Sequence, residues 1–159
     1  MLEPKLKKAA QAILRNNSLL IASGSGMAAD CKLVDRNGDL INKSYEKDYI
    51  PTFRGTYGLW KEYPVLRKNL ISFDELVEES FFKDYPEQFW YVYGDLFNRY
   101  SRAVPHKGYN KLKEIIEMAN KRKKHYVYHS GIDKLYLKSG FDRERYVQAK
   151  GSIMDWQCK

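Results

Sequence analysis

Short apolar runs that end in glycine-containing turns alternate along the chain with longer segments of helical periodicity. Residues 19–22 are continuously apolar and are followed by Gly24 and Gly26. Such a run predicts a buried parallel strand that leaves its sheet through a tight turn. Residues 125–130 and 146–149 have the same character and predict two further strands.

Amphipathic segments lie before and between these runs, with apolar residues recurring every three or four positions. The predicted helices cover residues 5–16, 72–82, 86–100 and 105–119, and a short helix ends at Gly140. Ser72 and Glu75 form a capping box at the start of the second helix. This order predicts an α/β fold: a partial doubly wound (Rossmann-like) parallel sheet of about three strands with flanking helices and an aromatic-rich helical insertion.

Two segments have no clear period. Residues 32–49 contain Asn37-Gly38 between two apolar pieces, which predicts a type I′ hairpin inserted on the surface or a lid over the first glycine turn. Residues 50–64 are rich in glycine, proline and aromatic residues. Long irregular segments in compact domains are often functional, although an aromatic-packed loop explains the same composition.

Length and composition limit the number of domains, the class of partner and the cellular compartment. The length of 159 residues predicts one domain over residues 1–159. The net charge of +8 fits nucleic acid, an anionic cofactor or an acidic partner. Two cysteines give no disulfide framework, and no apolar run is long enough to span a membrane. We expect an intracellular protein; the basic start is either a first helix or a mitochondrial presequence, so mitochondrial and cytoplasmic locations stay open.

The three predicted strands leave the sheet at Gly24–Gly26, Ser130–Asp133 and Ala149–Ser152. Ligands of open α/β sheets bind where strands exit. Glycines let backbone N–H groups approach a phosphate, although a tight strand exit needs glycine for steric reasons alone. Arg54 beside Phe53 could serve a phosphate or a flat ring.

Five segments follow one another along the chain: Gly24-Ser-Gly26-Met, Ile50-Pro-Thr-Phe-Arg-Gly55 with Gly58-Leu-Trp60, Pro105-His-Lys-Gly-Tyr-Asn-Lys-Leu112, Ser130-Gly-Ile-Asp133, and Val147-Gln-Ala-Lys-Gly-Ser152. In this order they resemble the sirtuins, the NAD-dependent protein deacylases. The resemblance implies that Gly24, Ser25 and Gly26 hold the NAD pyrophosphate. It places Phe53 and Arg54 at the nicotinamide-ribose end, and Ile132 and Asp133 at the nicotinamide amide.

Three positions depart from the family pattern. Lys150 stands where the family has the histidine general base, Gly131 where it has the ribose-orienting asparagine, and Thr52 where it has aspartate. A histidine base has a pKa near 6.5, whereas lysine amines ordinarily sit near 10.4 and are protonated at neutral pH. We therefore expect no intact catalytic set, and leave binding of NAD or ADP-ribose open.

The resemblance also implies parts that residues 1–159 lack. Cys158 looks like the first of four zinc cysteines, so no zinc or other metal site is expected, and the zinc ribbon and second half of the sheet are absent. The strand at residues 18–22 would then be an exposed apolar edge, a liability that a permanent protein partner would cover.

The leading hypothesis is a catalytically dead sirtuin-like domain that serves as a structural subunit of a larger assembly. The alternative is an active NAD-dependent deacylase or ADP-ribosyl transferase completed by another chain. A second alternative is an RNA-contacting subunit of a ribonucleoprotein that uses the basic run Lys121–Lys124.

Overall fold

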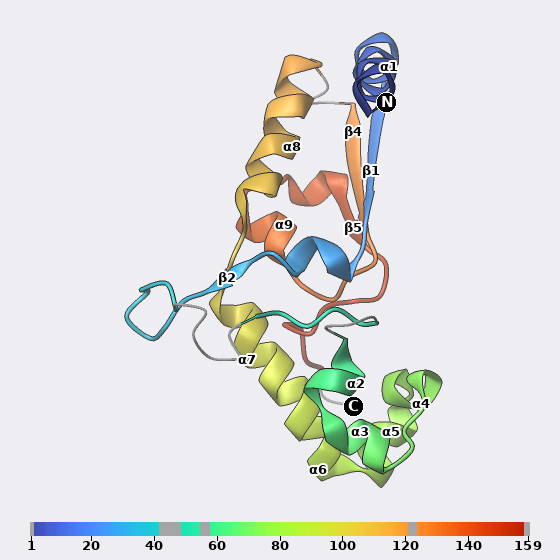
Figure 1. The fold of residues 1–159 in the computed structure, drawn as a ribbon, viewed down its shortest axis with the longest axis vertical. Coiled ribbons are helices and arrows are strands. Elements are labelled where there is room, and N and C mark those ends of the chain that lie inside the picture. Colours follow the sequence, from blue (N-terminus) through green and yellow to red (C-terminus); the bar gives the residue numbers. More distant parts are fainter. Residues whose placement is uncertain (1, 42–48, 55–57, 121–123, 158–159) are drawn as a thin grey trace.

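A three-stranded parallel sheet organises the fold (Figure 1). Its strands are β1 (Leu19–Ser23), β4 (His125–His129) and β5 (Tyr146–Gln148), in the order β1-β4-β5. The computed structural model describes residues 2–41, 49–54, 58–120 and 124–157. The predicted α/β class and parallel sheet are confirmed, and β1 lies at an edge where it pairs with β4 alone among the described strands.

Helices α8 (Lys107–Met118) and α9 (Leu135–Lys138) lie on one face of this sheet (Figure 1). Alternate residues of β4 are therefore buried, and Tyr126 and Tyr128 between them are exposed. Leu20 of β1 is 67% exposed. The prediction that the first strand is buried is wrong, because β1 is an edge strand and its second face is uncovered within the described chain.

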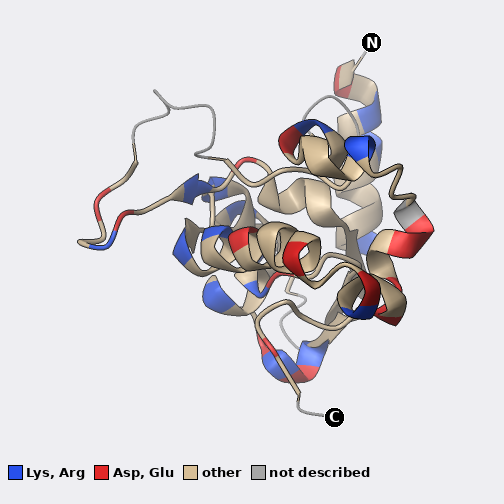
Figure 2. Cartoon of the chain, turned by 90° about the horizontal axis from the view of Figure 1, so that it is seen from below, with Lys and Arg blue, Asp and Glu red and all other residues tan. Residues whose placement is uncertain are grey.

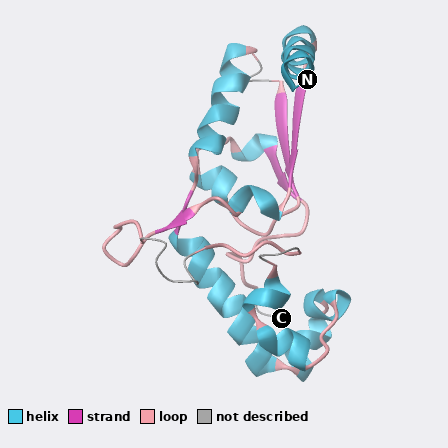
Figure 3. Cartoon of the chain, viewed as in Figure 1, coloured by secondary structure: helices cyan, strands magenta, loops and turns pink. Residues whose placement is uncertain are grey.

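The remaining helices gather at the other end of the molecule, except for α1 (Leu2–Arg15), which precedes β1 (Figure 3). They are α2 (Leu59–Glu62), α3 (Pro64–Lys68), α4 (Phe73–Val77), α5 (Glu79–Asp84), α6 (Pro86–Phe89) and α7 (Asp95–Arg102), with a π-helical turn, Trp90–Gly94, between the last two. Helix α1 is amphipathic but buries none of its residues. None of the helices in the described ranges has the length and apolar character to cross a membrane.

The local signals at the start of α4 act as predicted. The Ser72 hydroxyl accepts from the Glu75 N–H at 3.2 Å, and the Glu75 carboxylate accepts from the Ser72 N–H at 2.7 Å. The helix nevertheless ends earlier than residues 81–82, because Glu78 is extended (φ −83°, ψ 151°) and α5 begins after it. The capping box is confirmed and the predicted single helix is wrong.

The segment expected as an insertion begins inside the core. Strand β2 (Lys32–Leu33) pairs antiparallel with β3 (Ala103–Val104), and Leu33 is buried. The turn that follows is not type I′, which needs positive φ at both central residues. Of Asn37 and Gly38, only Gly38 has positive φ (88°), and the Asp35 carboxylate accepts from the Asn37 N–H. Residues 42–48 of the predicted insertion lie outside the described residues.

A buried guanidinium joins α7 to the segment that precedes α2. Arg99 is 2% exposed and donates to the Tyr49 carbonyl at 2.8 Å and to Asp95 at 2.9 Å. It also forms an ion pair with Glu62, whose side chain is 8% exposed. These contacts fix residues 49–54 against the helices, because each oxygen is held by the same rigid, planar group.

We expect Arg99→Ala to lower the free energy of unfolding by about 3–5 kcal/mol, because the truncation leaves Glu62 buried without its counter-charge. Urea denaturation measures this loss. The matched control is Lys83→Ala, which removes an exposed pair with Glu79 at 3.0 Å and costs about 0.5 kcal/mol. Equal losses in the two variants would contradict a dominant role for the Arg99 network.

Candidate ligand pocket

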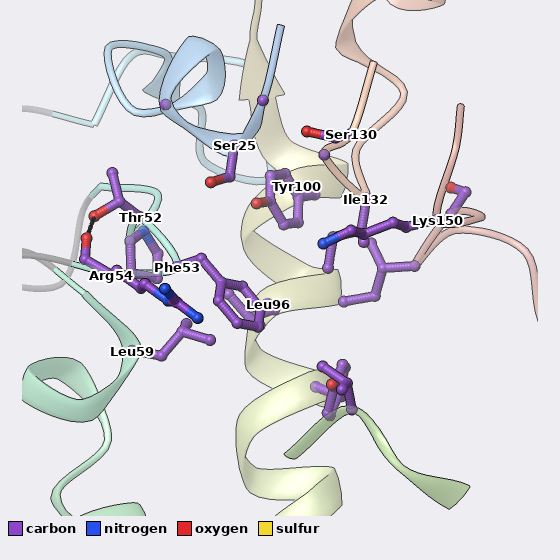
Figure 4. A pocket seen from close by; sticks show the side chains of 18 of the residues that line it. Ser25, Thr52, Phe53, Arg54, Leu59, Leu96, Tyr100, Ser130, Ile132 and Lys150 are labelled. Carbon is purple, nitrogen blue, oxygen red and sulfur yellow. Dashed lines mark hydrogen bonds between the residues drawn. The ribbon is translucent and has the colours of Figure 1, made fainter. Parts of the chain in front are cut away.

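A pocket of about 1030 Å³ opens where the parallel strands end (Figure 4). One wall is built from the three strand exits, and the other from the segment before α2 and from the aromatic residues of α6, α7 and the π-helical turn. Its polar and glycine lining consists of Gly24, Ser25, Gly26, Thr52, Arg54, Ser130, Gly131, Lys150, Ser152 and Asp155. Segments more than 120 residues apart in the sequence thus meet at one site.

Hydrogen bonds to His106 and within the chain fix the glycine turn, Gly24–Gly26, on its side away from the pocket. Gly24 leads into a 3₁₀ turn, Ser25–Ala28, and the Met27 N–H donates to the Gly24 carbonyl at 3.0 Å. The Met27 carbonyl lies 2.9 Å from Nε2 of His106, and Nδ1 of the same ring accepts from the Gly108 N–H at the start of α8. His106 therefore both caps α8 and anchors the turn that lines the pocket.

The segment 51–54 faces the glycine turn across the pocket. The Thr52 hydroxyl donates to the Arg54 carbonyl at 2.6 Å, and Thr52 forms a bridge with Gly58. The Phe53 ring packs edge-on against Trp60 at 6.3 Å between centroids. These local contacts place an aromatic ring and a guanidinium next to each other at the pocket wall, while Gly55 of the predicted motif lies outside the described residues.

The pocket carries excess positive charge. Figure 4 shows Lys150 and Arg54 entering it from opposite walls. The one acidic residue of the lining, Asp155, forms an ion pair with Lys134. The Lys150 ammonium makes no ion pair or hydrogen bond with any residue in the described ranges, so an anion in the pocket would supply a counter-charge to it.

The opposite wall is apolar and aromatic. Tyr93 donates to the Leu76 carbonyl at 2.8 Å, and burial raises its pKa to about 12. Burial also raises the pKa of Tyr100, with a smaller contribution from the Asp133 carboxylate. Both phenols are therefore neutral at physiological pH, and this wall can pack against the uncharged rings of a ligand.

Asp133 lies behind the pocket rather than in its lining. It is fully buried, and its carboxylate lies 2.9 Å from the His129 ring and accepts from the Leu135 N–H at 3.0 Å. Burial, and then the charge of Asp133, raise the pKa of Tyr109 and of Tyr146. In this arrangement the Asp133 carboxylate links the His129 ring to the start of α9 through hydrogen bonds. Its predicted contact with the nicotinamide amide stays a prediction.

The other predicted site residues line this one pocket: Gly24, Ser25, Gly26, Phe53, Arg54, Gly131, Ile132 and Lys150. Four further lining residues, Phe89, Tyr93, Leu96 and Tyr100, come from the predicted helix over residues 86–100 and were not among the predicted site residues. Their helical spacing is the signal of an inward-facing stripe and cannot distinguish a packed core from a pocket wall. No group of metal-ligating side chains occurs in the described ranges, and Cys158 lies outside them.

Comparison with known proteins identifies the family. The model of the Sir2 family matches residues 47–159. The chain belongs to the Sir2 family. An NAD-dependent protein deacylase of Candida albicans is 31% identical to this Sir2-family chain over 111 residues, which are 69% of the chain and 33% of the relative. The chain thus spans about a third of the length of that relative.

Two solved Sir2 structures have the same fold. One is a mutant Sir2 homologue in complex with 2′-O-acetyl ADP ribose, with a TM-score of 0.61 and 22% identity, covering 91% of this chain and 46% of that one. The other is a Sir2 mutant with a deacetylated p53 peptide and 3′-O-acetyl ADP ribose, with a TM-score of 0.63 and 18% identity, covering 93% and 48%. Nearly all of this Sir2-family chain therefore corresponds to about half of each structure.

We expect Lys150→Gln to weaken binding of inorganic pyrophosphate about 5- to 20-fold, because a charge-assisted contact is worth about 1–2 kcal/mol. Calorimetric titration at fixed ionic strength measures the effect. Lys8→Gln is the matched control, since it removes the same charge from the exposed surface of α1. Equal weakening by the two variants would indicate a general effect of net charge and no contact at the pocket.

Proposed function

We propose that this Sir2-family chain is a non-catalytic domain that retains an anion-binding nucleotide pocket and serves as a structural part of a larger assembly. The observation that carries the proposal is the Lys150 side chain in the pocket, at the position where the sirtuin resemblance puts the general base. Lysine amines are ordinarily protonated at neutral pH, and a protonated amine has no lone pair with which to accept a proton from a ribose hydroxyl.

The rest of the pocket supports binding without that reaction. The glycine turn and two cations suit a pyrophosphate, and Phe53 with the aromatic wall suits a ribose and a flat ring. Gly131 offers no side-chain amide to orient the ribose. The residues present therefore fit the phosphate and ribose portions of NAD or ADP-ribose, and when bound NAD would supply the leaving group of a deacylation.

Active deacylation, or ADP-ribosyl transfer, completed by another chain is the second candidate. It is favoured by Phe53, Arg54 and Ile132, three residues that the resemblance assigns to the cofactor site and that line the same pocket. The two candidates differ in whether any group of the assembled site takes up a proton. A measurement of catalysis therefore distinguishes the two candidates, whereas a measurement of NAD binding does not.

The proposed role in an assembly rests on the uncovered side of the sheet. Leu20 is 67% exposed, and Tyr126 and Tyr128 are 41% and 46% exposed on the same sheet. An edge strand with apolar neighbours is a ready site for pairing with another polypeptide. The two solved Sir2 structures are each about twice as long as this chain.

A nucleic-acid role has less support. Figure 2 shows Lys and Arg spread over many elements with Asp and Glu among them, rather than segregated onto one of them. Residues 121–123 of the predicted basic run lie outside the described residues. RNA contact remains an alternative whose signature is a steep loss of affinity with added salt.

We expect no nicotinamide release from NAD above the rate without protein when the native assembly is given acetyl-lysine peptide. The physical reason is the absence of a proton acceptor at position 150. Chromatographic detection of nicotinamide measures it. Release that disappears in Phe53→Ala but persists in Lys8→Ala would overturn the proposal in favour of the second candidate, because only the first change alters the pocket.

We also expect the double variant Leu20→Lys and Tyr128→Lys to leave its native assembly and migrate at the size of a single chain. Two charges on this side of the sheet would have to be desolvated against a partner. Size-exclusion chromatography of the protein from its source measures the change. Leu70→Lys, at a residue 87% exposed among the helices, is the matched control. A wild-type chain that is already monomeric there would contradict a structural role.

A further inference from the structure

A buried chain of polar side chains crosses the sheet directly behind the pocket. Nδ1 of His129 lies 2.9 Å from the Ser23 hydroxyl, and its Nε2 lies 2.9 Å from Oδ2 of Asp133. His129 and Asp133 are both fully buried. Both ring nitrogens of His129 thus have a polar partner within hydrogen-bond distance.

The His129 ring occupies the space next to Gly131. A Cβ atom added at Gly131 would lie 2.4 Å from Nε2 and 2.6 Å from Cε1 of His129, and 2.9 Å from Oδ2 of Asp133. Gly131 does not have positive φ, since the described glycines that do are Gly38, Gly140 and Gly151. Glycine is therefore required at position 131 by close approach and not by backbone conformation.

We propose that His129 is a positioning residue that closes the back wall of the pocket and excludes any side chain at position 131. Its imidazole takes the volume into which such a side chain would project, and it holds the Asp133 carboxylate behind the wall. This inference deepens the proposed non-catalytic function by explaining why position 131 has no side-chain amide. It rests on the proposed function only in taking that missing amide as a loss of catalysis. The geometry itself involves no ligand.

The direction in which a Cβ atom at position 131 would point decides whether the asparagine of the sirtuin pattern can be restored there. From the observed backbone, a side chain at 131 points toward His129 and Asp133, neither of which is among the residues that line the pocket. Gly131→Asn alone would therefore put an amide against the buried, hydrogen-bonded side chains of His129 and Asp133 rather than toward a ribose. A smaller residue at 129 is needed before any side chain at 131 can be accommodated.

A double-mutant cycle of Gly131→Ala and His129→Ser tests the proposal. We expect Gly131→Ala to lower the Tm by about 2–12 °C in the wild-type background, because the added methyl overpacks the space that the His129 ring occupies. In the His129→Ser background, we expect it to lower the Tm by less than half as much, because the two contacts with the ring are gone and only the 2.9 Å contact with Oδ2 of Asp133 remains. Gly26→Ala is the matched control at a second pocket glycine, where an added Cβ has no atom within 4 Å. Equal losses in both backgrounds would overturn the proposal.

A second measurement keeps the test decisive if His129→Ser does not fold. The chain has three histidines, so ¹⁵N-histidine spectra can be assigned by substitution. We expect the His129 ring N–H to be protected from exchange in the wild type, and its signal to shift or vanish in Gly131→Ala but not in Gly26→Ala. An unchanged signal in Gly131→Ala overturns the proposal. Neither readout involves NAD, so catalysis by the wild type would remove the proposed function and leave this inference standing.

Discussion

Parallel pairing of β1 with β4 is the constraint on which the rest of the structure depends. Leu19 is paired with His125, and Ser23 with His129, so the two strands end at the same level of the sheet. Their exits, the glycine turn and Ser130–Asp133, therefore lie side by side even though more than 100 residues separate them. Strand β5 pairs on the other side of β4 and brings Lys150 to the same edge.

The second wall of the pocket depends on a different interaction. The Arg99 side chain is almost fully buried and contacts Tyr49, Glu62 and Asp95. It thereby fixes to α7 the segment that carries Phe53 and Arg54. The aromatic residues of α7 and of the π-helical turn complete this wall. The pocket is thus the space between a sheet edge and a helical group, each fixed by its own internal contacts.

The residues that shape the binding cavity are distinct from the groups that a proton transfer would need. The glycine turn, Phe53, Arg54 and Ile132 line the pocket, and positions 131 and 150 in the same lining hold a residue without a side chain and a lysine. A binding cavity depends on many contacts, each with a modest energy. A proton transfer depends on one group with a suitable pKa, so two substitutions can remove the reaction and leave the cavity.

The order of motifs in the sequence determined the family, the three parallel strands, the capping box at Ser72 and most of the pocket lining. These features follow from local rules, since glycine, proline and apolar periodicity act within a few residues. Only the tertiary structure decided that the helix breaks at Glu78 and that Asp133 lies behind the pocket. It also decided why position 131 is glycine: strand periodicity shows that His129 points inward, but the atom that it meets depends on the turn that follows, and that contact exists only in the folded chain.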